Sequence, residues 1–208
     1  MLAPSPYLPS DKDKEVVSRL RSALQEKFGS SLSPKVTDTC ILRFYRGFKE
    51  KEDVSLNELT KHQEWRVAIK ADTIHLLTHE FPKAIESNVT TIGATDRNGR
   101  PAAYNFVHRH VTRERDITEM RKFIVYIAEH LLAASRPEEE RFVIVMDLKR
   151  FTLACMDYEV VKSLINILQV SVDSTVLYNI MYCTIRVCVC TICDTSHCVW
   201  YIMCASSI

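Results

Sequence analysis

The spacing of apolar residues predicts three amphipathic helices in the first part of the chain. In the stretch 12–28 the apolar side chains recur at helical spacing, and Gly29 suits the left-handed conformation that ends a helix. That stripe consists of Val16, Val17, Leu20, Leu24 and Phe28. A second helix is predicted over 38–48, with a buried side made of Ile41, Leu42, Phe44 and Tyr45. A third opens at Ser55 and Glu58, which have the spacing of a capping box, and runs to about Lys70.

The pattern changes after the third helix, and short strands are predicted. The first covers 89–93 and the second 102–107, and Asn98 followed by Gly99 between them is a strong signal for a hairpin turn. A continuous apolar run follows over 142–146. Because this run is short and rich in β-branched residues, it suits a strand buried on both faces of a parallel or mixed sheet.

Two further helices are predicted on either side of the apolar run. Asp116 and Glu119 have capping-box spacing and open a helix that runs to about Ala134. One face of this helix carries Met120, Phe123, Ile124, Ile127 and Leu131. The last helix covers 157–169, with apolar Val160, Val161, Leu164, Ile165 and Leu168. Strands alternating with helices after a helical segment predict an α/β sandwich, in which helices cover a mixed sheet.

Composition divides the 208-residue chain into two parts. The tail, 170–208, holds six of the eight cysteines and three formally charged side chains, and it has no glycine, proline or lysine. We therefore predict a disordered N-terminus over 1–11, a helical module over 12–70, an α/β domain over 78–169 and an unrelated cysteine-rich tail over 170–208.

Charge and the N-terminus bear on the partners and the compartment. With 27 basic and 26 acidic side chains the formal charge is +1, so no global field attracts the chain to nucleic acid or to an anionic membrane. The first ten residues contain three prolines and no apolar run, which argues against a secretory signal or a transit peptide. We expect a cytoplasmic protein.

Four short motifs follow one another along the chain. The stretch 40–46 is similar to a Leu-Arg-Phe-Leu-Arg signature of N-terminal helices, and 61–66 looks like the Trp-Arg close of the same module. The stretch 96–101 resembles an Asp-x-x-Gly-Arg-Pro turn between two strands, and Met-Asp-Leu-Lys at 146–149 is the fourth motif. In this order they resemble the CRAL-TRIO family, which includes the yeast phosphatidylinositol transfer proteins.

The resemblance implies binding and intermembrane transfer of a phospholipid or another hydrophobic molecule, without catalysis, cofactor or metal. In this family the sheet is the floor of the lipid pocket. The lipid-contacting candidates are therefore Tyr104, Phe106, Ile144, Met146 and Leu148, with Phe123 and Ile127 on a packing helix. Each of them is also compatible with plain core packing, because side chains alternate between the two faces of a strand. The implied protein is a monomer that touches membrane surfaces transiently and binds no nucleic acid.

Two places in the sequence bear on which lipid headgroup the protein would recognise. Members that bind phosphatidylcholine carry small hydroxyl residues in the strand before the aspartate, whereas this chain has Phe142 and Ile144 there, which argues against a choline site. Members that bind phosphoinositides use a basic residue just after the Leu-Arg-Phe signature. Lys49 follows Phe48 at that place and is the headgroup candidate.

The family pattern stops after Gln169. The expected Tyr-Pro-Glu segment, a further core strand and the helix that closes over the lipid do not follow. Codons for Gln169, Val170 and Ser171 can spell a consensus splice donor, so we hypothesise that 170–208 is translated intron. The genomic sequence tests this, because the idea requires a family-like exon downstream in frame.

Truncation would weaken the pocket. Burying a methylene group is worth about 0.8 kcal/mol, so a lipid with about 30 of them needs roughly 20 kcal/mol of replacement environment. Loss of core strands should also leave an unpaired apolar sheet edge. We therefore expect lipid transfer to be defective in this form.

Two other interpretations of the tail stay open. Thiolates and an imidazole could form a zinc site, although their spacing matches no standard zinc knuckle. These ligands are Cys188, Cys190, Cys193, His197 and Cys198. The stretch 175–193 has about the length of a membrane anchor, but Asn179 and Arg186 interrupt it.

Two histidine-containing segments raise further possibilities. His75 and His79 beside Glu80 are reminiscent of a metalloprotease helix, but the order differs and Pro82 would break the helix, which favours surface histidines. A short basic stretch could touch phosphates, but no aromatic platform for bases accompanies it, which favours a solvated loop. It consists of His108, Arg109, His110, Arg113 and Arg115.

No enzyme class is indicated. The chain has four scattered glycines, and neither a glycine-rich phosphate loop nor a nucleophile elbow is present. The rival to lipid transfer is a non-enzymatic protein-interaction or regulatory module of the same fold. A module of that kind would carry no lipid on native extraction.

Overall fold

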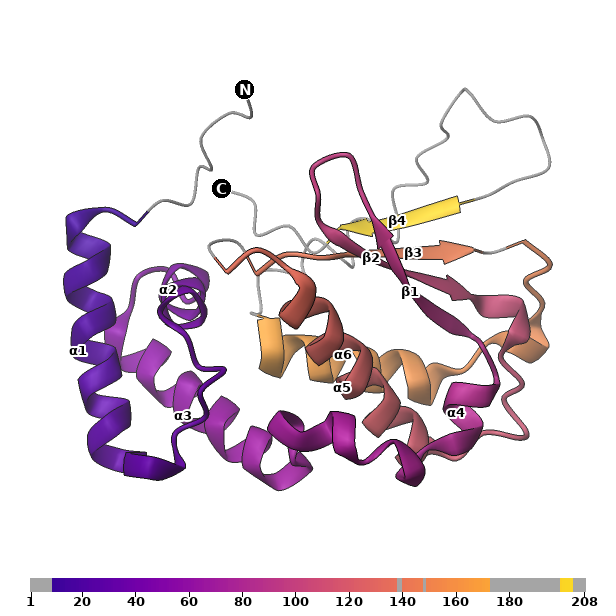
Figure 1. Ribbon diagram of the computed structural model, residues 1–208, viewed down its shortest axis with the longest axis horizontal. Coiled ribbons are helices and arrows are strands. Elements are labelled where there is room, and N and C mark those ends of the chain that lie inside the picture. Colours follow the sequence, from indigo (N-terminus) through magenta and orange to yellow (C-terminus); the bar gives the residue numbers. More distant parts are fainter. Residues whose placement is uncertain (1–8, 138–139, 148, 173–198, 204–208) are drawn as a thin grey trace.

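The computed structural model describes residues 9–137, 140–147, 149–172 and 199–203 (Figure 1). Three helices at one end of the molecule are followed by a sheet with two long helices along one of its faces. All six tail cysteines fall outside the described residues. The zinc and membrane-anchor interpretations of the tail, and most of the segment 1–11, therefore also lie outside them.

The N-terminal module consists of α1 (Asp11–Phe28), α2 (Asp38–Gly47) and α3 (Glu52–Ile69), close to the predicted bounds. Ser10 caps α1, since its hydroxyl accepts from the Asp13 amide at 3.2 Å and the Asp13 carboxylate accepts from the Ser10 amide at 2.9 Å. Gly29 ends α1 with φ +53°. The apolar stripes of the helices meet in one cluster that includes Leu24, Ile41, Phe44 and Leu59.

The start of α3 differs from the prediction. The helix begins at Glu52 and its first residues have no side-chain cap. Ser55 lies inside the helix, fully buried, and its hydroxyl donates to the Lys51 carbonyl at 2.6 Å. The predicted capping box of Ser55 and Glu58 is therefore wrong, because the serine bonds back to a helix carbonyl instead of to amides ahead of it.

A connection of short turns leads to the sheet. It contains η2 (Ala71–Leu76), η3 (Thr78–Glu80) and α4 (Pro82–Glu86). His75 and His79 are exposed and lie in separate 3-10 turns, so they do not share the single helix that a metalloprotease motif needs. The preference for surface histidines is consistent with these positions.

The sheet is mixed, with the order β1-β2-β3-β4. Its strands are β1 (Thr90–Thr95), β2 (Pro101–Phe106), β3 (Val143–Asp147) and β4 (Val199–Met203). β2 and β3 run parallel, and β1 and β4 pair antiparallel with them on the two sides. β4 occupies the edge of β3 and is itself a terminal strand of the described sheet, so the expectation of an unpaired apolar edge stays a prediction.

A hairpin turn joins β1 to β2 as predicted. Gly99 has φ +75°, which favours glycine. The Asp96 carboxylate organises the turn, since it accepts from the amides of Asn98 and Arg100, both at 2.9 Å. The Arg100 side chain is also paired with Asp96.

The parallel pair is connected through α5 (Ile117–Ala134), and α6 (Tyr158–Val172) follows β3. The Asp116 carboxylate caps α5 by accepting from the amides of Thr118 and Glu119, at 2.7 and 3.2 Å. Both helices lie along the same face of the sheet in Figure 1. The predicted α/β class, with a three-helix module ahead of a mixed sheet covered by helices, is confirmed, although the sandwich is partial.

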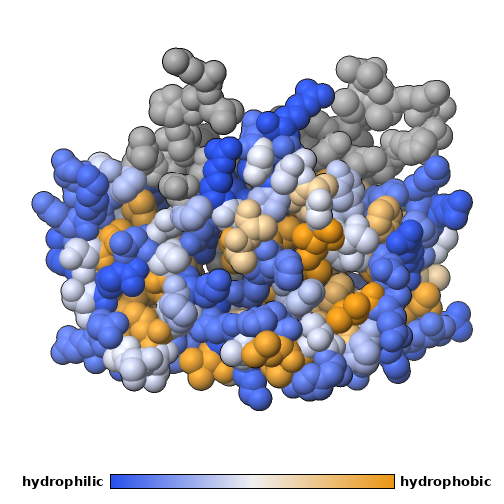
Figure 2. Space-filling view, in the orientation of Figure 1, coloured by the Kyte–Doolittle hydropathy of each residue, from blue (hydrophilic) through white to orange (hydrophobic). Residues whose placement is uncertain are grey.

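Figure 2 shows mostly hydrophilic residues on one face of the molecule, with apolar residues gathered in small separate areas. Within the described part of the chain, no helix combines the length and apolar character that a membrane crossing needs.

Candidate functional site

An apolar cavity of about 70 Å³ lies between the sheet and helices α5 and α6. We call it the sheet–helix cavity. The strands contribute Thr90, Ala103, Asn105, Phe142, Ile144 and Met146. The helices contribute Met120, Phe123, Ile124, Ile127, Ala128, Leu131, Val160 and Leu164. Every lining side chain except Thr90 and Asn105 is apolar, so this space suits a hydrocarbon group.

The two ends of the sheet–helix cavity differ in polarity. At one end Ala103, Leu131 and Phe142 are at most 1% exposed and pack into one cluster. At the other end Asn105 and Thr90 face each other across β1 and β2, with the Asn105 amide nitrogen 3.4 Å from the Thr90 hydroxyl. The cavity therefore has a closed apolar end and a polar end, an arrangement that fits an amphiphile.

The structure brings four of the sequence-predicted residues together at this cavity, namely Phe123, Ile127, Ile144 and Met146. Tyr104 is 39% exposed and lies on the opposite face of β2, since its strand neighbour Ala103 faces the helices. Phe106 ends β2 and lies under the Arg109 guanidinium, 4.4 Å from ring centroid to Cζ. A role for any of these residues in lipid contact stays a prediction.

The two other candidates lie elsewhere. Leu148 falls outside the described residues. Lys49 is exposed in the turn after α2, with φ +56°, and does not line the sheet–helix cavity.

Register explains which strand residues the sequence reasoning missed. Ala103 pairs with Ile144 and Asn105 with Met146, so these four share one face of the parallel pair. The predicted Tyr104 and Phe106 belong to the other set of alternating β2 positions. Because side chains alternate along a strand, Phe142 could have been predicted to share the face of Ile144 and Met146. Which β2 residues face the helices depends on the pairing of β2 with β3.

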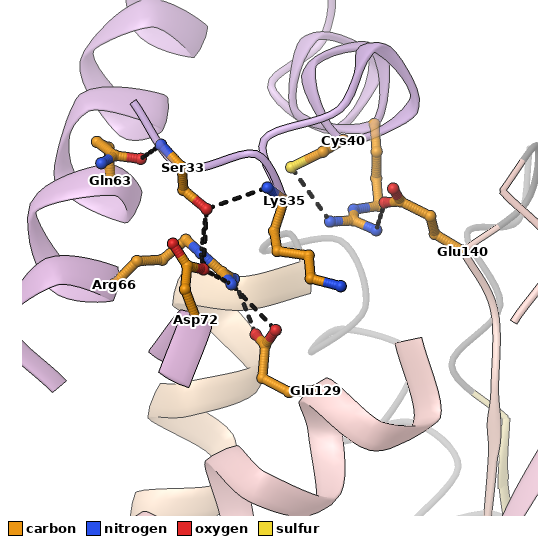
Figure 3. A network of polar contacts seen from close by, with 9 residues as sticks. Ser33, Lys35, Cys40, Gln63, Arg66, Asp72, Glu129 and Glu140 are labelled. Carbon is orange, nitrogen blue, oxygen red and sulfur yellow. Dashed lines mark hydrogen bonds and ion pairs between the residues drawn. The ribbon is translucent and has the colours of Figure 1, made fainter. Parts of the chain in front are cut away.

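A second, polar cavity of about 210 Å³ lies between the N-terminal module and the end of α5. Two arginines and their carboxylate partners form ion pairs in it (Figure 3). Arg66, which is 4% exposed, donates to both Glu129 oxygens at 2.8 and 3.0 Å and also to Asp72. Arg43 pairs with Glu140 at 2.8 Å. These ion pairs bridge the module to the α/β domain.

Cys40 borders the polar cavity. Burial raises the pKa of its thiol, which keeps the group neutral, and Arg43 Nη2 donates to Sγ at 3.5 Å. A neutral, 2% exposed thiol is a poor nucleophile, so Cys40 fits a packing role.

The loop after β2 is fastened to the start of α6 by Asp157. His110 Nε2 lies 2.9 Å from one carboxylate oxygen, Arg115 pairs with the same group, and Asp157 also caps α6 through the Val160 amide at 3.1 Å. Burial alone would raise the pKa of Asp157, but the hydrogen bonds from Arg115, His110 and the helix amide outweigh it and lower the pKa to about 2. His110 and Arg115 of the predicted basic stretch are thus structural, while Arg109 and Arg113 are exposed.

Comparisons with known proteins agree with this architecture. Residues 85–180 match the family model of the CRAL/TRIO domain, a range that continues past the predicted break at Gln169. The fold is similar to the crystal structure of Sfh5, with 16% sequence identity, a TM-score of 0.55, and coverage of 78% of this chain and 67% of that one. No curated protein matches the chain in sequence. The domain limits drawn from composition stay predictions.

The motif order, the mixed sheet with its helices on one face, and the matched region 85–180 agree with one another. Residues 85–180 of this chain therefore match the CRAL/TRIO domain in sequence, as the motifs predicted, and the fold agrees with that match.

Proposed function

We propose that this protein binds a single phospholipid, or another hydrophobic molecule, and transfers it between membranes without covalent chemistry. The observation that carries the proposal is the sheet–helix cavity, which is apolar along its length and polar at the Thr90–Asn105 end. Acyl chains would lie against α5 and α6, and a polar group would remain near Asn105. The protein would act as a cytoplasmic monomer in transient contact with membrane surfaces.

Loading a lipid requires the cavity to open. Its volume of about 70 Å³ has room for a few water molecules at most. A phospholipid is much larger, so α5 and α6 would have to move away from the sheet during uptake. The rate at which this form transfers lipid would depend on that movement. The expectation of defective transfer stays a prediction.

Lipid extraction tests the proposal directly. The full chain would be purified without detergent, extracted with organic solvent and examined by mass spectrometry for a stoichiometric lipid. Transfer would be followed by dequenching of a fluorescent phospholipid moved from donor to acceptor vesicles. Absence of both bound lipid and fluorescent-lipid uptake would contradict the proposal and favour a protein-interaction module.

Two adjacent alanines provide a matched pair of variants. Ala103 lines the sheet–helix cavity, whereas Ala102 lies on the opposite face of β2, and both are at most 3% exposed. Enlarging either residue to leucine overpacks a buried site and costs about 1–3 kcal/mol of stability. We expect Ala103→Leu to lower lipid uptake several-fold and Ala102→Leu to retain it, because only the first fills the cavity. Equal loss in both variants would count against the cavity as the site.

Phosphatidylinositol is the headgroup that we propose to test first, with Lys49 as the candidate contact. If Lys49 meets the headgroup, Lys49→Gln should lower uptake of phosphatidylinositol but not of phosphatidylcholine. The exposed Lys51, two residues away, supplies the control Lys51→Gln.

A further inference from the structure

Large apolar side chains project into solvent beside the edge of the sheet where the parallel strands β2 and β3 end. Of the ten large apolar residues that the described part of the chain exposes, six lie in the two segments that follow these strands. They are Val111, Phe151, Leu153, Met156, Tyr158 and Val161. Leu153 is 83% exposed and Tyr158 is 70% exposed. We call this set the apolar edge patch.

The two segments form one continuous surface. The Thr112 hydroxyl donates to the carbonyls of Ala154 and Met156, at 3.1 and 3.4 Å. Asp157 fastens the same segments through Arg115. The apolar edge patch is therefore held in place by bonds between its two halves, and its side chains face solvent from a supported backbone.

Basic residues occupy the same segments as the patch, and we call them its basic rim. Five exposed lysines and arginines occupy the same two segments and the first turns of α6, against three exposed carboxylates. The basic residues are Arg109, Arg113, Lys149, Arg150 and Lys162, and the acidic ones are Glu114, Asp116 and Glu159. Protruding apolar side chains with a basic rim match a lipid interface, where hydrocarbon lies below a layer of anionic headgroups.

The patch also borders the polar end of the sheet–helix cavity. Met146, at the end of β3, and Val160, in α6, line that cavity. Val161, the next residue of α6, is 46% exposed in the apolar edge patch. A molecule leaving the cavity past Met146 and Val160 would emerge beside these exposed side chains.

We propose that the apolar edge patch docks the protein on anionic membranes by inserting Leu153, Met156 and Tyr158 among the lipid headgroups. Its role in lipid exchange rests on the proposed function, but docking itself is measured without any cargo. The basic rim supplies attraction at a distance, and burial of the apolar side chains holds the docked state.

Vesicle flotation with the full chain tests docking. The vesicles would contain phosphatidylcholine alone, or phosphatidylcholine with about one-fifth phosphatidylserine. We expect Leu153→Ser to weaken vesicle affinity about tenfold, because this side chain would lose its burial in the bilayer. Leu76→Ser is the control, since Leu76 is 64% exposed and lies in η2, outside the patch. That variant should bind as the unaltered protein does.

The contribution of the basic residues is tested with a double variant, Arg150→Gln together with Lys162→Gln. This pair should weaken binding to vesicles with phosphatidylserine, leave binding to neutral vesicles unchanged, and lose its effect in high salt. Circular dichroism of each variant would establish that the fold is retained.

Three outcomes would overturn the proposal: no vesicle binding by the unaltered protein, equal losses in Leu153→Ser and Leu76→Ser, or a patch variant that alters only self-association. Bound lipid would be extracted from the same samples. Cargo without docking would overturn the patch but not the proposed function, and docking without cargo would overturn the proposed function but not the patch.

Discussion

Arg66 in α3 and Glu129 in α5 form a two-pronged ion pair, with nitrogen–oxygen distances of 2.8 and 3.0 Å. The Arg66 side chain is 4% exposed and that of Glu129 is 13% exposed. Because the two residues belong to the helical module and to the α/β domain, this pair joins the two parts of the fold at a buried point.

Removing the carboxylate should destabilise the protein. In Glu129→Ala the Arg66 charge stays buried and keeps only Asp72 and Ser33 as partners, so we expect a loss of about 2–3 kcal/mol in the free energy of unfolding. Urea denaturation measures this loss. The control is Glu64→Ala, whose carboxylate is 3.8 Å from Lys27 on the surface and should contribute less than about 0.5 kcal/mol. Equal values for the two variants would contradict the assignment.

Asp157 should make the protein sensitive to acid. Its folded pKa of about 2 lies below the value near 3.9 expected in the unfolded chain. The depressed pKa means that the stabilisation is complete above pH 4 and is lost as the pH falls toward 2, by about 2 kcal/mol.

The measurement is urea unfolding at a series of acidic pH values. Asp157→Asn should be less stable at neutral pH and should lack this part of the pH dependence. Asp53→Asn, at an exposed position of α3, should keep the pH dependence of the unaltered protein. An unchanged acid profile in Asp157→Asn would show that other carboxylates dominate.

Leu131 closes the apolar end of the sheet–helix cavity and is fully buried. Truncation to alanine removes buried methyl groups and leaves a larger void, so Leu131→Ala should lose about 2–5 kcal/mol in thermal or urea unfolding. Leu76→Ala, at a residue that is 64% exposed, should change stability by less than about 0.5 kcal/mol. A small effect at Leu131 would mean that the α5–sheet contact is looser than the packing indicates.

Asp116 caps α5 with bonds to two backbone amides. Asp116→Ala should therefore cost about 1 kcal/mol of unfolding free energy, whereas Asp116→Asn keeps an acceptor oxygen and should cost less. Thermal unfolding of the two variants under the same conditions checks the order. A reversed order would contradict the role of the Asp116 side chain as a hydrogen-bond acceptor, because only the asparagine variant keeps an acceptor oxygen.

Local signals in the sequence were sufficient for most elements. Apolar residues at helical spacing located α1, α2 and α5, and the Asn98–Gly99 pair located the hairpin. These helices and the hairpin depend on residues only a few positions apart, so the sequence pattern alone predicts them. The start of α3 was mispredicted because the Ser55 hydroxyl can either cap backbone amides at a helix start or donate to a helix carbonyl. In the structure it donates to the Lys51 carbonyl.

The site was only partly predictable. Phe123 and Ile127 lie on the expected face of α5, and Ile144 and Met146 on one face of β3, because spacing within one element determines which side chains share a side. Tyr104 and Ala103 could not be told apart in that way. Their orientation depends on the register of β2 against β3, and a shift of one residue would exchange them.

The sequence by itself determined the order of the elements, the apolar faces and the motifs that resemble the CRAL-TRIO family. The tertiary structure decided which face of β2 meets the helices, and it paired Arg66 with Glu129 across 63 positions of sequence. It also gave β3 a neighbour, β4, from the far end of the chain. The physical reason is that helix and turn propensities act between near neighbours, whereas strand register and buried ion pairs exist only once distant segments have packed together.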